Sequence, residues 1–179
     1  MEEKRLIEGC IRCELTAQKK MYELHASAMM SVCQRYVGNR DVARDLLHDG
    51  FIKLFAKIHT YSAAGSFNGW VKKIFVTTAL EYLRCNDVLK YSIEIEDINN
   101  KIEDDEILPF EQLQANDLLN CIAKLPYGYR TVFNMHAIEG YTHTEIAGEL
   151  GISESASRSQ YARARQMLRK MIGEKVLKS

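Results

Sequence analysis

The side chains best suited to bind a ligand lie near the C-terminal end of the sequence. Arg158 and Arg163 carry guanidinium groups, and Ser159 and Ala162 fall largely on the same side of a helical pattern. Guanidinium groups bind phosphates and guanine edges, whereas hydroxyl groups hydrogen-bond to other bases. Residues 154–179 hold 7 basic and 2 acidic side chains, so positive charge gathers there. This face predicts contact with DNA, and a solvated basic helix in an αα-hairpin is the alternative.

The residues around this face have the pattern of a helix-turn-helix. Thr142 and Glu145 form a capping box that starts one helix. Gly151 suits the left-handed position that ends it, and Ser153 can cap a second helix. The apolar side of the second helix is formed by Tyr161, Ala164, Leu168 and Met171. A short helix, a tight turn and a longer helix with a basic outer face are typical of DNA-binding helix-turn-helix motifs.

A second candidate nucleic-acid surface lies between residues 59 and 85. A polar loop at 59–66 precedes a helix that we expect from Phe67 to about Cys85. That helix carries Trp70, Lys72, Lys73 and Thr77. Aromatic rings can stack on unpaired bases while lysines follow the phosphates, so the pattern indicates single-strand binding. Packing of Phe67 and Trp70 in the core is the alternative, and the two roles can coexist.

A row of carboxylates follows one side of the helix expected at 40–57, which Asn39 caps. Asp41, Asp45, Asp49 and Lys53 recur every four residues and therefore share a face. Such a row is either a solvated face or a docking surface for an arginine-rich partner. Carboxylates spread along one helix do not converge on an ion, so no metal site is expected there.

No motif of an enzyme is found in the sequence. A Gly-rich phosphate loop, a nucleophile motif and HExxH are all missing, so we expect neither catalysis nor a cofactor. His136, His143 and Glu145 could form a metal cluster, but the two histidines fall on different helices flanking a turn. The Cys10-x-x-Cys13 pair has no second pair at a suitable spacing, which favours helix packing over zinc binding.

Composition predicts an all-α protein of two small domains. Hydrophobic residues make up 46% of the chain, with two prolines and ten glycines, and strand-like alternation is scarce. The net charge is zero, yet residues 86–117 hold 2 basic and 10 acidic side chains. We therefore expect a four-helix N-terminal domain at 1–88, a flexible acidic linker at 89–116 and a helix-turn-helix domain at 117–179. The expected helices are 2–13, 15–37, 40–57, 67–85, 117–124 and 128–139, followed by the helix-turn-helix.

Five cysteines, an odd number, with no signal peptide and no membrane-length apolar run predict a cytoplasmic protein without membrane insertion.

Taken together, these stretches resemble the extracytoplasmic-function (ECF) class of bacterial sigma factors, the compact two-domain type. Residues 41–55 resemble the polymerase-binding helix of that family, and 67–84 resemble its −10 recognition helix. Its −35 domain is matched by Leu125-Pro126, residues 130–133, 138–141, 145–147 and 150–153, and Arg163-Ala164-Arg165-x-x-Leu168. The resemblance covers about 15–172, and the order and spacing of the motifs make the joint match specific.

The resemblance implies a role for each matched surface. The −35 element would be read by Ser155, Arg158, Ser159, Ala162 and Arg163. The melted −10 element would be captured by Tyr61, Ser62, Ser66, Phe67, Trp70, Lys73 and Thr77. Core RNA polymerase would bind Asp45, His48, Asp49 and Lys53. Ser157 stands where the family usually has an aliphatic residue on the recognition helix.

The resemblance also implies partners: promoter DNA, the β′ clamp helices and β flap of core RNA polymerase, and an anti-sigma factor. The acidic linker would thread the active-site cleft and RNA exit channel of the polymerase. The other hypothesis is a helix-turn-helix transcriptional regulator that acts without core polymerase. Such a regulator binds its operator alone, whereas a sigma factor binds promoters specifically only as holoenzyme.

Overall fold

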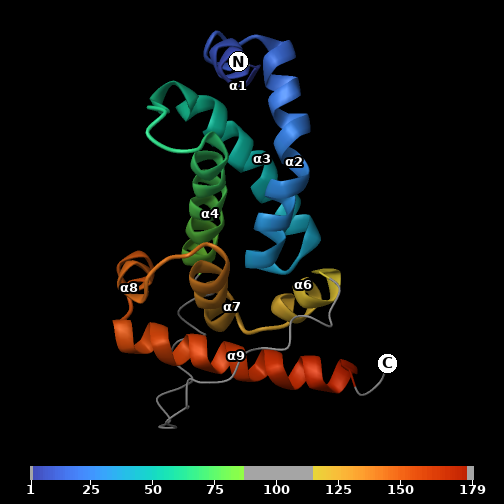
Figure 1. Cartoon of the computed structure of the whole chain (residues 1–179), viewed down its shortest axis with the longest axis vertical. Coiled ribbons are helices and arrows are strands. Elements are labelled where there is room, and N and C mark those ends of the chain that lie inside the picture. The colour runs from blue at the N-terminus through green and yellow to red at the C-terminus, as the bar shows by residue number, and fades with distance from the viewer. Residues whose placement is uncertain (1, 87–114, 177–179) are drawn as a thin grey trace. The chain divides into compact units, whose positions relative to one another are not determined.

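The computed structural model describes residues 2–86 and 115–176, and the regular elements in these ranges are all helical (Figure 1). The chain divides into two compact units, Met1–Leu83 and Arg84–Ser179. The all-α class with two helical domains is thus confirmed. The acidic linker predicted at 89–116 lies outside the described residues except for its last two positions, which begin a helix.

The first unit consists of four helices and one short 3-10 turn. They are α1 (Glu2–Ile11), α2 (Leu15–Val37), α3 (Arg40–Lys57), η1 (Ile58–Thr60) and α4 (Phe67–Cys85). Gly38 ends α2 with a φ of 70°, and the Asn39 side chain accepts hydrogen bonds from the backbone N–H groups of Asp41 and Val42 at 2.9 and 3.1 Å. These are the predicted boundaries. The first helix ends earlier than predicted, because Cys13 adopts a left-handed φ of 59° in a turn.

The core of the first unit is shared by α2, α3 and α4, and α3 approaches α4 closely at one point. Gly50 lies so close to Phe75 that a Cβ at position 50 would be 2.3 Å from Cε1 of the ring. Phe51 packs edge-on against the same ring, with a centroid distance of 5.2 Å, and also contacts Tyr22. Lys53 and Glu81 form an ion pair between the two helices at 2.5 Å. A residue without a side chain at position 50 therefore sets the separation of α3 and α4.

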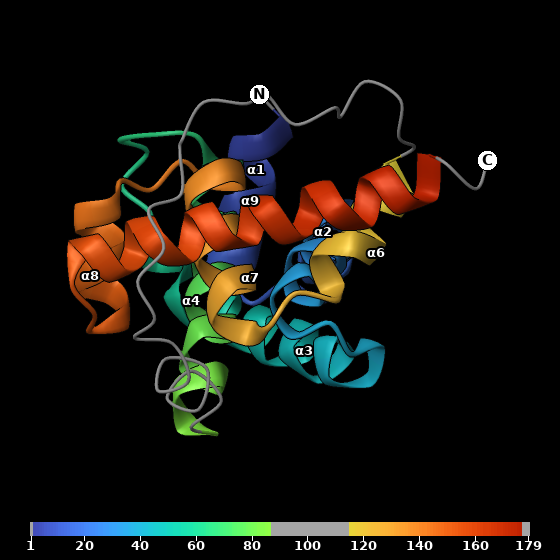
Figure 2. The ribbon, with the colours of Figure 1, turned by 90° about the horizontal axis from the view of Figure 1, so that it is seen from below.

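The second unit is built around one long helix. It contains α6 (Ala115–Ala123), α7 (Tyr127–Phe133), a π-helical turn η3 (Asn134–Ile138), α8 (His143–Leu150) and α9 (Glu154–Val176). The helix α9 packs against α6, α7 and α8 (Figure 2). Its core cluster is Cys121, Ile122, Leu125, Tyr129, Phe133, Ala164, Leu168 and Ile172.

The segment before the helix-turn-helix differs from the prediction of one helix at 128–139. The helix α7 changes into the π-helical turn, in which the N–H of Glu139 donates to the carbonyl of Asn134 at 2.9 Å. A π-turn accommodates one extra residue and shifts the side chains after it around the helix axis. Within the ranges 2–86 and 115–176, no helix is both long enough and apolar enough to span a bilayer.

We expect Gly50→Ala to lower the free energy of unfolding by about 1–3 kcal/mol, because the added methyl group would overlap the Phe75 ring and force it to move. Gly148→Ala is the matched control: a Cβ there meets no atom within 4 Å, so this change should stabilise α8 by about 0.5–1 kcal/mol. Chemical denaturation monitored by circular dichroism measures both. Equal stability of the Gly50→Ala protein and the parent would contradict the close approach.

Candidate nucleic-acid interface

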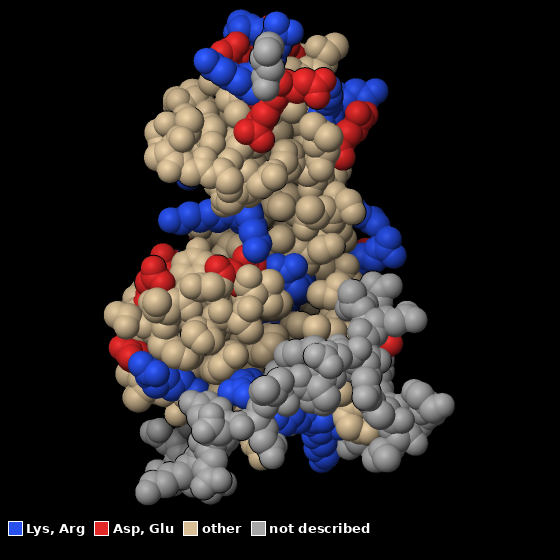
Figure 3. All heavy atoms as spheres, viewed as in Figure 1, with Lys and Arg blue, Asp and Glu red and all other residues tan. Residues whose placement is uncertain are grey.

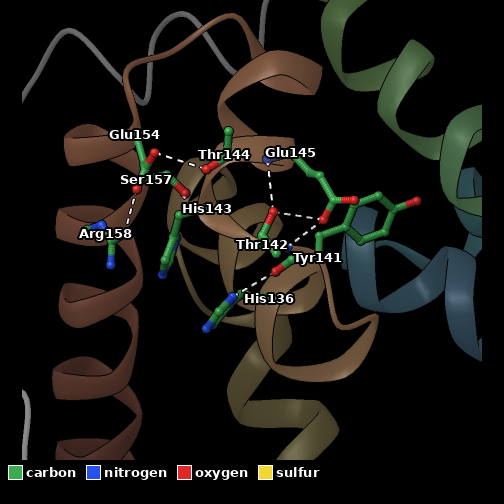
Figure 4. Close-up of polar contacts among 9 residues, drawn as sticks. All are labelled: His136, Tyr141, Thr142, His143, Thr144, Glu145, Glu154, Ser157 and Arg158. Carbon is green, nitrogen blue, oxygen red and sulfur yellow. Dashed lines mark hydrogen bonds and ion pairs between the residues drawn. The ribbon is translucent and has the colours of Figure 1, made fainter.

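The turn between α8 and α9 is fixed by local hydrogen bonds. Thr142 Oγ1 accepts from the N–H of Glu145 at 3.2 Å, and the Glu145 carboxylate accepts from the N–H of Thr142 at 2.8 Å (Figure 4). Gly151 ends α8 with a φ of 68°. Ser153 Oγ then accepts from the N–H of Ala156 at 3.1 Å. The capping box, the left-handed glycine and the serine cap predicted from the sequence are all confirmed.

The predicted −35 residues lie on the side of α9 that faces away from the core. Ala164 and Leu168 are fully buried, whereas Ser155, Arg158 and Ser159 are exposed. Lys and Arg side chains follow this helix on the surface seen in Figure 3. Ala162 and Arg163 are half-buried at the edge of the face, and Arg163 donates to the Tyr129 hydroxyl at 3.3 Å. The structure thus groups the exposed members of the set near the start of α9.

A carboxylate that the sequence analysis did not select lies beside Arg158. Arg158 Nη2 donates to Glu154 Oε1 at 2.5 Å, and the Thr144 hydroxyl donates to Glu154 Oε2 at 3.0 Å (Figure 4). The hydrogen bond from Arg158, followed by that from Thr144, lowers the pKa of Glu154 below its ordinary value. The i,i+4 spacing of Glu154 and Arg158 was the sequence signal for this pair.

Ser157 faces inward and has a polar partner. Its side chain is fully buried, and its Oγ lies 2.8 Å from Nδ1 of His143 (Figure 4). The His143 ring stacks on His136 with a centroid distance of 4.2 Å, and Tyr161 packs edge-on against both rings. His136 Nδ1 is 2.8 Å from the carbonyl of Tyr141, so this nitrogen carries the proton and donates. A serine therefore fits the inward position because a histidine from α8 meets it.

The three residues weighed as a metal cluster, His136, His143 and Glu145, do not converge on a common point. The Glu145 carboxylate is engaged by Thr142, and the two rings stack against each other. Among the described residues, no three His, Cys, Asp or Glu side chains gather in an arrangement suited to a metal ion.

The loop after η1 is closed by an aromatic cluster. The Tyr61 hydroxyl donates to the carbonyl of Gly65 at 2.6 Å, and its ring contacts Phe67 and Trp70 at centroid distances of 5.1 and 5.5 Å. Phe67 is only 2% exposed, so its ring contacts Tyr61 and Trp70 from the core side and offers no free face on which a base could stack. Tyr61 and Trp70 are half-buried, and the other residues predicted for the −10 element, Ser62, Ser66, Lys73 and Thr77, are exposed.

The predicted docking row on α3 is exposed in part. Asp45, His48 and Asp49 are exposed, whereas Lys53 is half-buried and paired with Glu81. Ile52, which the sequence analysis did not select, continues the row and is 67% exposed. Its spacing of seven residues from Asp45 was the signal that could have found it.

Two family models match the chain, one for each unit. The model described as "Sigma-70 region 2" matches residues 21–88, and that described as "Sigma-70, region 4" matches 115–168. The chain is 28% identical over 148 residues to "ECF RNA polymerase sigma factor SigE" of Mycolicibacterium smegmatis, covering 81% of this chain and 57% of that protein. The chain belongs to the ECF sigma factors. A second ECF relative, "ECF RNA polymerase sigma-E factor" of Haemophilus influenzae, is 23% identical over 183 residues, or 96% of either chain.

Two solved structures share the fold. The sigma factor RpoE from Bartonella quintana, solved with the anti-sigma factor NepR, gives a TM-score of 0.53 at 17% identity, covering 87% of this chain and 96% of that one. CnrH, solved with the cytosolic domain of CnrY, gives a TM-score of 0.50 at 17% identity, covering 97% and 99%. At 17% identity, the similarity to these two structures shows a shared fold.

We expect Ser157→Ala to lower the free energy of unfolding by about 1 kcal/mol, because the hydrogen bond to His143 is lost in a buried site. Ser159→Ala is the matched control on the exposed side of α9, and it should change stability by less than about 0.5 kcal/mol. Thermal denaturation of the two purified variants measures the difference. A Ser157→Ala protein at least as stable as the parent would show that the serine contributes nothing to the packing of α9.

Proposed function

We propose that this ECF sigma factor directs core RNA polymerase to promoters and reads the −35 element with the exposed face of α9. The observation that carries the proposal is the row of Ser155, Arg158 and Ser159 at the start of the second helix of an intact helix-turn-helix. In such motifs the N-terminal residues of the second helix contact base edges in the major groove. Ala162 and Arg163, at the edge of the same face, would contact neighbouring bases or phosphates.

The surface around Trp70 is proposed to hold the melted −10 element. Trp70, Lys73 and Thr77 follow one another at helical spacing on α4, and Tyr61 packs beside Trp70. Half-buried rings can stack on unpaired bases, and an exposed lysine can contact the phosphates. Ser62 and Ser66 on the loop would add hydrogen bonds, while the buried Phe67 would position the loop.

The exposed row on α3 is proposed to bind the β′ clamp helices of the polymerase. Asp45 and Asp49 would pair with arginines, His48 lies between them, and Ile52 would add an apolar contact at the end of the row. Lys53 would act chiefly through its ion pair with Glu81, which ties α3 to α4. The helix-turn-helix unit would contact the β flap.

A sigma factor is favoured over a regulator that acts alone, because the chain matches sigma region 2 as well as region 4. Since a sigma factor of similar fold was solved in complex with an anti-sigma factor, we also propose an anti-sigma partner for this chain. The proposed place of action is the cytoplasm, where polymerase and promoter DNA are found. We propose no catalytic step for this chain.

We expect Asp45→Arg with Asp49→Arg to abolish co-elution with core polymerase, because like charges would then face an arginine-rich surface. Glu8→Arg with Glu23→Arg is the matched control, since it makes the same change in net charge on exposed positions of α1 and α2. Size-exclusion chromatography with purified core enzyme measures binding, and circular dichroism checks the helical content. Unchanged co-elution of the α3 variant would contradict the docking surface.

Replacement of residues 61–66 by a Gly/Ser segment of equal length should block promoter opening while −35 binding and polymerase docking persist. Holding one base unstacked costs a few kcal/mol, and the loop, including the Tyr61 ring, would supply the compensating contacts. Permanganate footprinting should show the loss of reactive thymines near the start site, and a template with a pre-melted bubble should recover part of the transcription.

A second replacement, of residues 62–66 alone, keeps Tyr61 against Trp70. It separates contacts made by the loop from support given by the aromatic cluster. Normal opening by both replacements would show that the loop does not capture the −10 element.

A further inference from the structure

Glu154 forms a bridge between the two helices of the helix-turn-helix. One carboxylate oxygen accepts from the hydroxyl of Thr144 on α8, and the other accepts from the guanidinium of Arg158 one turn along α9 (Figure 4). Both side chains of the ion pair are partly exposed, at 64% for Arg158 and 42% for Glu154, so the pair lies on the surface that would meet DNA. The carboxylate also sits in the first turn of α9, where negative charge stabilises a helix.

This bridge limits the positions that the Arg158 guanidinium can take. Arg158 has five N–H donors in a rigid planar fork, and the bond to Glu154 uses one terminal nitrogen. The remaining donors can still make a bidentate contact with the O6 and N7 atoms of guanine. Because Thr144 holds the carboxylate, the fork is oriented before DNA arrives, and less side-chain entropy is lost on binding.

The negative charge of Glu154 also affects the choice of ligand. A carboxylate next to a guanidinium repels phosphate oxygens, and it partly neutralises the cation that would attract them. A base edge carries only partial charges and is repelled less. The pair therefore favours base reading by Arg158 over a phosphate contact.

We propose that Glu154 is a positioning residue for −35 recognition: anchored by Thr144, it orients Arg158 toward a guanine and away from the phosphates. The inference rests on the proposed function, in which Arg158 reads a base of the −35 element. It predicts a loss of base preference, together with a steeper salt dependence, when the carboxylate is neutralised.

The experiment measures binding of the full-length sigma factor, as holoenzyme with purified core polymerase, to a promoter library randomised in the −35 element. Arg158→Ala first identifies the base pair that Arg158 reads, as the position whose preference is lost. Glu154→Gln should then reduce discrimination at that same position by about threefold to tenfold, a part of what one bidentate contact supplies. DNA binding by the Glu154→Gln protein should also depend more steeply on salt concentration, with a change in slope equal to about one additional phosphate contact.

Three further variants test the route of the effect. Thr144→Val removes the hydroxyl at nearly constant shape and should relax the same position, but less. In the Arg158→Ala background, Glu154→Gln should have no further effect on base preference. Glu149→Gln removes one carboxylate from the exposed part of α8 and should leave the preference unchanged. Glu154→Asp keeps the negative charge on a side chain that is one methylene group shorter, and so tests whether the charge alone preserves the base preference. Thermal melts of each variant check that the fold is retained.

The outcomes separate the inference from the function on which it rests. If Arg158→Ala changes no preference, the proposed base reading by Arg158 is wrong. If Arg158→Ala relaxes one position but Glu154→Gln does not, only the positioning role is wrong. Tighter binding by Glu154→Gln with full preference would mean that the ion pair sequesters Arg158. A change at a different position that persists without Arg158 would mean that Glu154 reads a base itself, as an acceptor for cytosine N4.

Discussion

The apolar stripe along α9 is the constraint on which the proposed −35 surface depends. Ala164, Leu168 and Ile172 are fully buried in the core of the second unit. Burying one Leu or Ile side chain contributes about 1.5–3 kcal/mol, so the stripe strongly prefers one rotation of the helix. A rotation by one residue would turn the stripe by about 100° and bring polar groups inward. The outward positions of Arg158 and Ser159 follow from what the opposite side buries.

In the first unit, the exposed side of α3 is likewise set by what its opposite side buries, and the packing there leaves less room for added atoms. Leu46, Leu47 and Leu54 face the core, and the exposed row at Asp45 and Asp49 lies on the other side. Here the core side also includes Gly50, against which the Phe75 ring packs. Close-packed interiors accommodate added volume poorly. The position of this exposed row relative to α4 is therefore set by a contact that an added side chain would disturb.

The features predicted correctly are those that neighbouring residues decide. Gly38 and Asn39 end one helix and start the next, and Thr142 with Glu145 caps α8, because each hydrogen bond joins residues within four positions. The π-turn was missed, since its preference over a regular turn depends on surrounding packing. Periodicity also left the role of Phe67 open. Its burial follows from the way the loop folds back through Tyr61, which no spacing rule describes.

The two ends of α9 are held by different kinds of interaction, and this difference bears on function. The C-terminal half is held by apolar burial, which has little directional preference. The N-terminal half is held by hydrogen bonds from the N–H of Ala156 to Ser153, from the Thr144 hydroxyl to Glu154 and between His143 and Ser157. Hydrogen bonds weaken steeply when their angles change, so they fix orientation as well as position. Bases are read by the N-terminal residues of such a helix, where small angular errors would misalign a bidentate contact. The directional interactions thus lie at the end of α9 that we propose reads the −35 element, and apolar burial stabilises the other end.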